Sequence, residues 1–258
     1  EKIKRNNKLR FAKYIKEKQG IEVNPESIFD VHCKRLHEYK RQLLKCLHII
    51  YIYQKIKKDP TCITTPITFI FAAKAAPGYV RAKEIIRLIH SIQEMVNKDS
   101  DMDGKIQVVF VENYCVSVAE MLIPAADIHE QISLASKEAS GTSNMKFMLN
   151  GAIAIGTEDG ANVEMHEFVG DNNIYIFGES SDEVIAHYEK ADYVSRNYYE
   201  KDPAIKRAID FLISDTMLAV GQKENLERLY HELLNKDWFM TLPDFEDYKA
   251  TKERIYAD

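Results

Sequence analysis

Short β-rich runs alternate with longer helical patterns over the first two thirds of the chain. The β-rich runs cover residues 27–33, 67–73, 106–112, 152–157 and 173–178, and apolar side chains recur at helical spacing over 41–56 and 79–96. Strands that alternate with helices predict a largely parallel sheet with helices on both faces, an α/β Rossmann-like fold. Such sheets bind ligands at the carboxyl ends of their strands, so the segments that follow these runs are the first candidates for a site.

After about residue 185 the pattern becomes mainly helical and polar. Residues 204–220 and 225–234 are predicted to form amphipathic helices that cover the sheet. No repeat, low-complexity tract or linker divides the 258 residues, so we expect one domain, 1–258. The first twenty residues predict a charged amphipathic helix without a signal-peptide core, and we expect the chain to be a piece of a longer protein.

Composition bounds the function classes. The net charge of −5 gives no sign of nucleic-acid binding, and no apolar run is as long as a membrane span. The four cysteines lack the spacing of a metal site, so we expect reduced thiols, a cytoplasmic protein and no metal.

Four cations lie between the first β-rich run and the helical pattern that follows it. The stretch "VHCKRLHEYKR", 31–41, contains Lys34, Arg35, Lys40 and Arg41. Cations are unfavourable at a helix amino terminus, which already has partial positive charge. A bound anion would be attracted by the cations and by the helix terminus alike. An anion site is one interpretation, and a solvated basic turn is the other.

Two further segments follow β-rich runs. In "AAKAAPGYVRAK", 72–83, Lys74 and small residues lead into a helix, which fits either a ligand-binding turn or a tight connection. In "EASGTSNMKFMLNGA", 138–152, a flexible turn precedes a helix predicted over 143–150, with Gly151 as its stop. Lys146 lies among apolar residues of that helix.

The position of Lys146 allows two interpretations. If the lysine is half-buried, apolar surroundings destabilise its ammonium form, and the neutral amine can form a Schiff base with an aldehyde. The alternative is a lysine whose charged end reaches solvent along the protein surface. The residues alone favour the lysine that reaches solvent.

Five stretches, in order, resemble blocks of the α-glucan phosphorylases, the glycogen, starch and maltodextrin enzymes. "EASGTSNMKFMLNGA" is very similar to the pyridoxal-phosphate attachment signature of this family. The other stretches are "KRLHEYKRQLL", "AAKAAPGY", "FVENYCVSVAEMLIPAADIHEQIS" and "GTEDGANVEM". The resemblance covers about residues 9–180 and continues more weakly to the end.

The resemblance implies the carboxyl-terminal half of a GT-B fold, with the amino-terminal domain absent from this chain. It also implies a glycosyltransferase reaction in which orthophosphate attacks the terminal α-1,4-linked glucose of an α-glucan and releases glucose 1-phosphate. The implied cofactor is pyridoxal 5′-phosphate, whose phosphate exchanges a proton with the substrate phosphate. The implied partners are the glucan, orthophosphate, the missing domain and a second copy in a full-length homodimer.

The resemblance also assigns roles to residues of this chain. Lys146 would bind the cofactor as a covalent Schiff base, and Lys34 with the backbone of Gly141 and Thr142 would cradle its phosphate. Tyr114 would lie near the pyridoxal ring. The catalytic cations would be Lys34, Arg35 and Lys40, the last two clamping the substrate phosphate. The sugar hydroxyls would bind Glu138, Ser140, Gly141 and Tyr39.

Departures from the family pattern are small apart from the missing half. Ser143 stands where the pattern often has glycine, and Cys115 and His32 are at variable places. Two other classes remain as alternatives, a pyridoxal-phosphate aminotransferase or decarboxylase and a nucleotide-sugar-binding module. The former needs an acidic partner for the pyridine nitrogen and an arginine for the substrate carboxylate, and the latter would form no lysine adduct.

Overall fold

The computed structural model describes residues 1–257 and contains one sheet of six parallel strands. The strands are β1 (Ile28–Cys33), β2 (Ile67–Ala72), β3 (Ile106–Val111), β4 (Ile128–Gln131), β5 (Ile153–Gly156) and β6 (Tyr175–Ile176). Their order in the sheet is β3-β2-β1-β4-β5-β6. The predicted α/β Rossmann-like fold is therefore confirmed, and the chain reverses its direction of travel across the sheet between β1 and β4.

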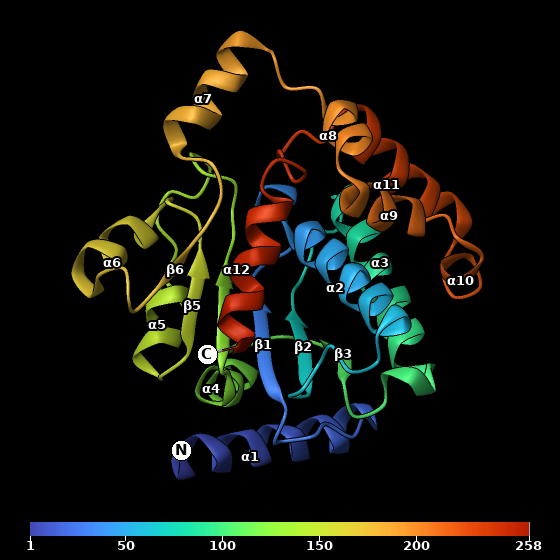
Figure 1. Cartoon of the computed structure of the whole chain (residues 1–258). Helices are drawn as coiled ribbons and strands as arrows, with labels where there is room; N and C mark the ends of the chain where they lie inside the picture. Colours follow the sequence, from blue (N-terminus) through green and yellow to red (C-terminus); the bar gives the residue numbers. More distant parts are fainter. Residues whose placement is uncertain (258) are drawn as a thin grey trace.

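Twelve α-helices within residues 1–257 surround the sheet (Figure 1). The helices up to residue 169 are α1 (Lys2–Gln19), α2 (Gln42–Lys58), α3 (Val80–Lys98), α4 (Val116–Ala125), α5 (Ser143–Leu149) and α6 (Ala161–Val169). The rest of the chain forms α7 (Ser181–Lys190), α8 (Ser195–Lys201), α9 (Pro203–Phe211), α10 (Asp215–Leu218), α11 (Lys223–Asn235) and α12 (Phe245–Ala257). Two short 3₁₀ turns cover Glu38–Lys40 and Ser100–Met102. No helix of residues 1–257 is long and apolar enough to span a bilayer.

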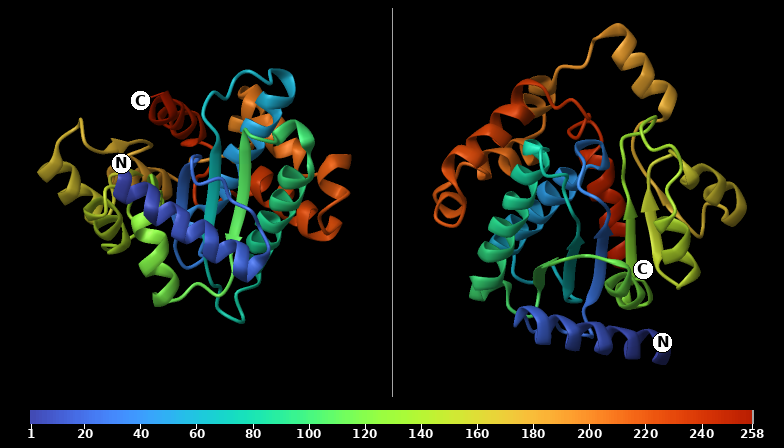
Figure 2. Two further views of the ribbon diagram at one scale, coloured as in Figure 1. Left: turned by 90° about the horizontal axis from the view of Figure 1, so that it is seen from below. Right: turned by 180° about the vertical axis from the view of Figure 1, so that it is seen from behind.

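Alternating side chains of the central strands build two cores. On β2, Phe69 and Phe71 join the core formed with α2, α3, α9, α11 and α12, whereas Ile70 packs with α1, α4 and α5. Because both faces are covered, the side chains of β2 and β3 are mostly apolar. In Figure 1, α12 lies over the front of the sheet, and Figure 2 shows α1 across the end from which the strands start.

The strand predictions were right for β1, β2, β3 and β5, but β6 is only two residues long and β4 was missed. β4 has the sequence "IHEQ", which lacks the apolar character of a buried parallel strand. The helix predicted over 204–220 is also two helices, α9 and α10, because residues 212–214 form a turn between them. The helices predicted to cover the sheet, α9, α10 and α11, instead pack mainly on α2 and α3, and it is α12 that lies over the sheet itself.

A buried ionic network explains why a polar strand lies at the centre of the sheet. Asp30 of β1 and Glu130 of β4 are fully buried beside Lys45 of α2 and Lys252 of α12. Lys252 Nζ donates to Asp30 and, at 3.0 Å, to Glu130 Oε1. Lys45 Nζ lies 2.9 Å from Asp30 Oδ1 and 3.1 Å from Glu130 Oε1. Each buried charge therefore has an opposite charge in contact, which offsets the cost of removing it from water.

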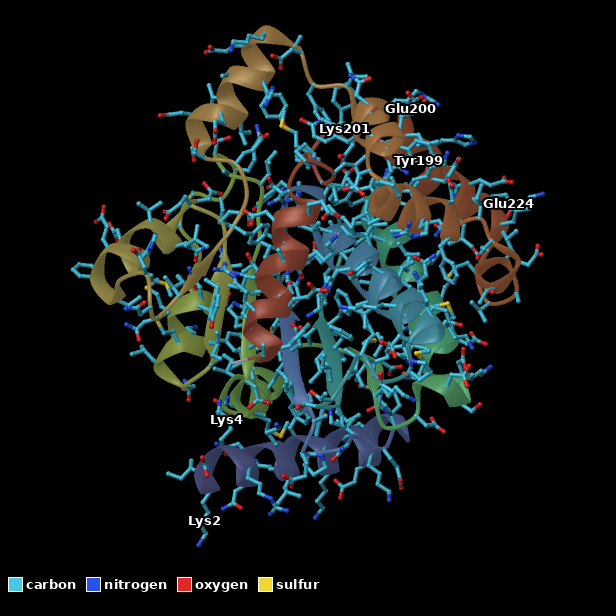
Figure 3. All side chains as sticks on the ribbon, in the orientation of Figure 1. Lys2, Lys4, Tyr199, Glu200, Lys201 and Glu224 are labelled. Atoms are coloured by element: carbon cyan, nitrogen blue, oxygen red, sulfur yellow. The ribbon has the colours of Figure 1, made fainter. Side chains whose placement is uncertain are left out.

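Helix α1 is tied to the ends of two other helices by a lysine. Lys4 Nζ donates to the carbonyl oxygens of Ala126, at 2.6 Å, and Asn150, at 3.0 Å, which are the carboxyl-terminal caps of α4 and α5. Carbonyls at a helix end lack partners within the helix, so a cation there is favourable. In Figure 3, Lys4 points toward α4 while Lys2, two residues earlier, points away from the protein.

Candidate active site

The carboxyl ends of β1, β2 and β3 stop in register. Cys33 pairs with Ala72, and Ala72 pairs with Val111, so the next residues of all three strands share one edge of the sheet. The backbone N–H of Lys34 also donates to the carbonyl of Ala72, at 3.0 Å. The segments 31–41, 74–78 and 112–114 are thus brought to the same edge, at the reversal point where ligands bind in such folds.

Lys34 is a buried cation without a counter-ion. The residue is 8% exposed, and it makes no ion pair with any residue of the range 1–257. Burial, followed by repulsion from the Lys40 ammonium, lowers the pKa of Lys34 to about 8. An ammonium group in this position is destabilised unless an anion joins it.

Lys40, Glu138 and Tyr39 form a polar cluster beside Lys34. Lys40 Nζ lies 3.6 Å from Glu138 Oε2 and 5.6 Å from the centre of the Tyr39 ring. Burial and the Glu138 charge raise the pKa of the Tyr39 hydroxyl, which stays protonated at neutral pH. The 3₁₀ turn holds this cluster against the loop after β4, because the N–H of Leu134 donates to the Tyr39 carbonyl at 2.8 Å.

The loop that contains Glu138 and Ser140 is held by the segment "EDGA" that follows β5. Asp159 accepts hydrogen bonds from the backbone N–H groups of Ser136, at 3.0 Å, and Glu138, at 2.7 Å. A Cβ atom at Gly160 would lie 2.5 Å from the carbonyl oxygen of Ser140, so the close approach requires glycine. Asp159 was absent from the predicted site, although the segment was recognised as part of a family block.

Gly141 turns the chain into α5 in a conformation that few other residues adopt. Its φ is +85°, and a Cβ atom there would lie 2.5 Å from Gln131 Nε2. Gln131 is 2% exposed, and neither of its amide atoms has a hydrogen-bond partner among residues 1–257. Ser143 Oγ and Asn144 Oδ1, in the first turn of α5, are also buried without partners in that range. The turn therefore brings together several polar atoms that a bound group could satisfy.

Of the two interpretations of Lys146, the structure supports the lysine whose side chain reaches solvent. Helix α5 turns Asn144 and Phe147, three residues apart, into the protein, and this leaves Lys146 on the exposed side. Burial within this chain therefore gives the amine no desolvation, and the side chain is open to a ligand.

The remaining predicted residues divide between exposed and half-buried positions. Arg35, Ser140 and Thr142 are exposed, as is Lys74. Tyr114 is half-buried, and burial together with contact to the Cys33 thiol raises the pKa of its hydroxyl. These side chains are available to ligands, and none is enclosed by the chain itself.

Arg41 does not belong to the anion site. The sequence grouped it with Lys34, Arg35 and Lys40, but its side chain is fully buried and Nη1 lies 2.6 Å from Asp244 Oδ2. Its Nε also donates to the carbonyl of Ile132, at 2.9 Å. Arg41 thus joins the loop before α12 to the end of β4. The carboxylate that pairs with it belongs to Asp244, 203 positions later in the chain.

The chain matches the family model described as "Carbohydrate phosphorylase" over residues 1–258. It is 56% identical over 258 residues to maltodextrin phosphorylase of Streptococcus pneumoniae, covering all of this chain and 34% of the relative. It is 52% identical over 240 residues to glycogen phosphorylase of Bacillus subtilis, covering 93% of this chain and 30% of the relative. The liver form of human glycogen phosphorylase is 47% identical over 254 residues, 98% of this chain and 30% of the relative. The chain spans about one third of the length of these relatives, and it belongs to the carbohydrate phosphorylase family.

Proposed function

We propose that this chain forms the cofactor-binding wall of an α-glucan phosphorylase. The complete protein would transfer the terminal α-1,4-linked glucose of glycogen or another α-glucan to orthophosphate and release glucose 1-phosphate. The family match and the names of the relatives support this reaction. The observation that carries the proposal is Lys34, a buried ammonium group without a counter-ion at the reversal point of the sheet.

The residues present fit pyridoxal 5′-phosphate. Lys146 offers an exposed amine for covalent attachment, and the glycine turn before it brings buried polar atoms without partners to the same place. Lys34, with the backbone of Gly141 and Thr142, would hold the cofactor phosphate, since an anion there would relieve the cost of the buried ammonium. Tyr114 would lie beside the pyridine ring.

The cofactor, when bound, supplies a phosphate group that can exchange a proton with the substrate phosphate. Two phosphates close together repel each other, and the cations of this chain would offset that repulsion. Arg35 and Lys40 would bind the substrate phosphate, in addition to Lys34. Lys40 already lies 3.6 Å from Glu138, so a phosphate would compete with a weak carboxylate contact, not with a tight pair.

The glucose hydroxyls would bind at the loop after β4. The groups that would bind them are Glu138, Ser140, Gly141 and the hydroxyl of Tyr39. Asp159 would act indirectly, because it holds the backbone N–H of Glu138 in place. The loop would therefore contact glucose with its first residues and phosphate with its turn.

The complete protein would have a GT-B fold, in which a second domain supplies the other wall of the cleft. We propose that it is a cytoplasmic homodimer and that residues 1–258 form one domain of it. Catalysis needs reactants held from both sides and water excluded from the phosphates. The isolated chain is therefore expected to release no measurable glucose 1-phosphate from glucan and orthophosphate.

Reductive labelling tests the proposed attachment. The chain is incubated with pyridoxal phosphate and sodium borohydride, and peptides are identified by mass spectrometry. We expect label on Lys146 and none at that position in Lys146→Arg, with Lys74→Arg as a matched exposed control that leaves labelling of Lys146 unchanged. Absence of label on Lys146 would refute the cofactor assignment, and saturable labelling elsewhere would favour a different class of aldehyde-binding site.

A further inference from the structure

The helix that bears Lys146 is too short to be stable alone. α5 has seven residues, and its cap Thr142 makes no side-chain hydrogen bond to it. Isolated helices of this length are unstable in water, so contacts with the rest of the protein must hold α5 in place. α5 packs on β4, β5, α6 and α4, and specific contacts lie near each end and in the middle.

The contacts at the two ends are polar. Asn144 Nδ2 donates to Asn162 Oδ1 of α6, at 2.9 Å, and Lys4 of α1 donates to the carbonyl of Asn150. The contact in the middle is aromatic. The ring of Phe147 lies flat on the ring of His129, with centroids 3.9 Å apart and planes 2° from parallel. Both residues are fully buried.

A histidine is unusual at this fully buried position. His129 lies on β4, and neither ring nitrogen has a hydrogen-bond partner of ordinary geometry among residues 1–257. The backbone of Val31 on the neighbouring strand interacts with the ring but makes no hydrogen bond of ordinary geometry, so no strong hydrogen bond within that range accounts for the residue. Burial and the nearby Lys34 ammonium hold the pKa of His129 well below its usual range, and the ring is therefore neutral.

Phe147 is the residue next to Lys146. Movement of its ring on His129 would turn α5 and displace the lysine amine, because neighbouring residues of a helix move together. His129 pairs with Val31 of the neighbouring strand β1, three residues before Lys34, so the stack and Lys34 stand on adjacent strands. We infer that His129 is a positioning residue, which fixes the Lys146 amine relative to Lys34 by stacking on Phe147.

This inference rests on the proposed attachment of pyridoxal phosphate at Lys146. In the attachment, the amine nitrogen bonds to the aldehyde carbon and the aldehyde oxygen leaves as water. Borohydride then adds hydride to that carbon, and solvent supplies the proton on nitrogen. The rate of this labelling reports how well the amine is placed, and it requires no turnover of glucan.

The test is a double-mutant cycle with His129→Leu, Phe147→Leu and the double variant. Loss of the stack is expected to slow labelling of Lys146 by about three- to tenfold in each single variant. The double variant should be no slower than the slower single variant, because both changes remove the same contact. His129→Phe, which keeps a flat ring, should restore the rate to within about twofold of the unmodified chain.

A matched control separates positioning from a general loss of stability. Phe29→Leu removes an equally buried ring from β1, where the ring contact of Phe29 is with Phe11 of α1. It should lower the melting temperature and leave labelling unchanged. Hydrogen exchange of residues 143–149, measured without cofactor, should be faster in the two stack variants and unchanged in Phe29→Leu.

The outcomes distinguish this inference from the proposed function. If the unmodified chain takes no label on Lys146, both are wrong. If it is labelled and the stack variants match it, or if Phe29→Leu slows labelling as much as His129→Leu does, only the positioning role is wrong. Independent, multiplying effects of His129→Leu and Phe147→Leu would also overturn it, since the two rings would then not act as one contact.

Discussion

Replacing Lys34 with methionine should make the empty chain more stable. Lys34 is buried without a counter-ion, and its pKa falls from the ordinary 10.5 to about 8. The lower pKa means that folding costs the charged form of Lys34 about 3 kcal/mol at neutral pH. Methionine keeps most of the apolar length and removes the charge, so Lys34→Met should gain up to about 3 kcal/mol in unfolding free energy at pH 7.

The pH dependence gives the sign of this effect. The folded pKa of Lys34 lies below its unfolded value, so between about pH 8 and 10.5 the unfolded chain binds a proton that the folded chain has released. The contribution of Lys34 to stability therefore rises with pH across this window. The advantage of Lys34→Met should be largest below pH 8 and should shrink toward pH 10.5.

Urea unfolding of both chains from pH 7 to pH 10 measures this difference. Lys74→Met, at an exposed lysine that also follows a strand, is the control and should change stability by less than about 0.5 kcal/mol. Sulfate, whose charge is constant over this range, should stabilise the unmodified chain more than Lys34→Met, because its general effect acts on both chains and its binding to the ammonium acts on one. A Lys34→Met chain that is less stable at pH 7, or a difference that does not vary with pH, would refute the reasoning.

Three further predictions concern other parts of the chain. Lys252→Met should lower the unfolding free energy by about 3–5 kcal/mol, because two buried carboxylates lose a cation, and a loss below about 1 kcal/mol in urea unfolding would contradict this. Gly141→Ala should weaken pyridoxal phosphate binding, followed by absorbance, because the turn has a φ of +85° and a side chain would meet a buried amide; unchanged affinity would show that the turn does not shape the site. Hydrogen bonds to two carboxylates raise the pKa of His166, so its contribution to stability is complete below its ordinary value of 6.5 and is lost as the pH rises through the folded value. His166→Gln should remove that part of the pH dependence of the melting temperature, and an identical profile for both chains would count against it.

The sequence by itself determined where the apolar strands lie and which segments follow them. The β1, β2 and β3 runs are buried on both faces, so each is mostly apolar and visible in one short window. The carboxyl ends of parallel strands meet at one edge, and this was enough to place Lys34 and Lys74 near each other before any coordinates. The ordered blocks around Lys146 also indicated the family, because they depend only on residues close together in the chain.

Tertiary structure alone decided the features whose partners are distant in the chain. β4 contains a glutamate that is tolerated in the core because Lys45 of α2 and Lys252, 122 residues later, lie against it. Arg41 looked like part of an anion site until Asp244 was placed beside it. The apolar neighbours of Lys146 in the sequence left two interpretations open, and packing of Phe147 on His129 sets which side of α5 faces solvent. A local pattern shows which residues need a partner, and only the folded chain shows which residue meets that need.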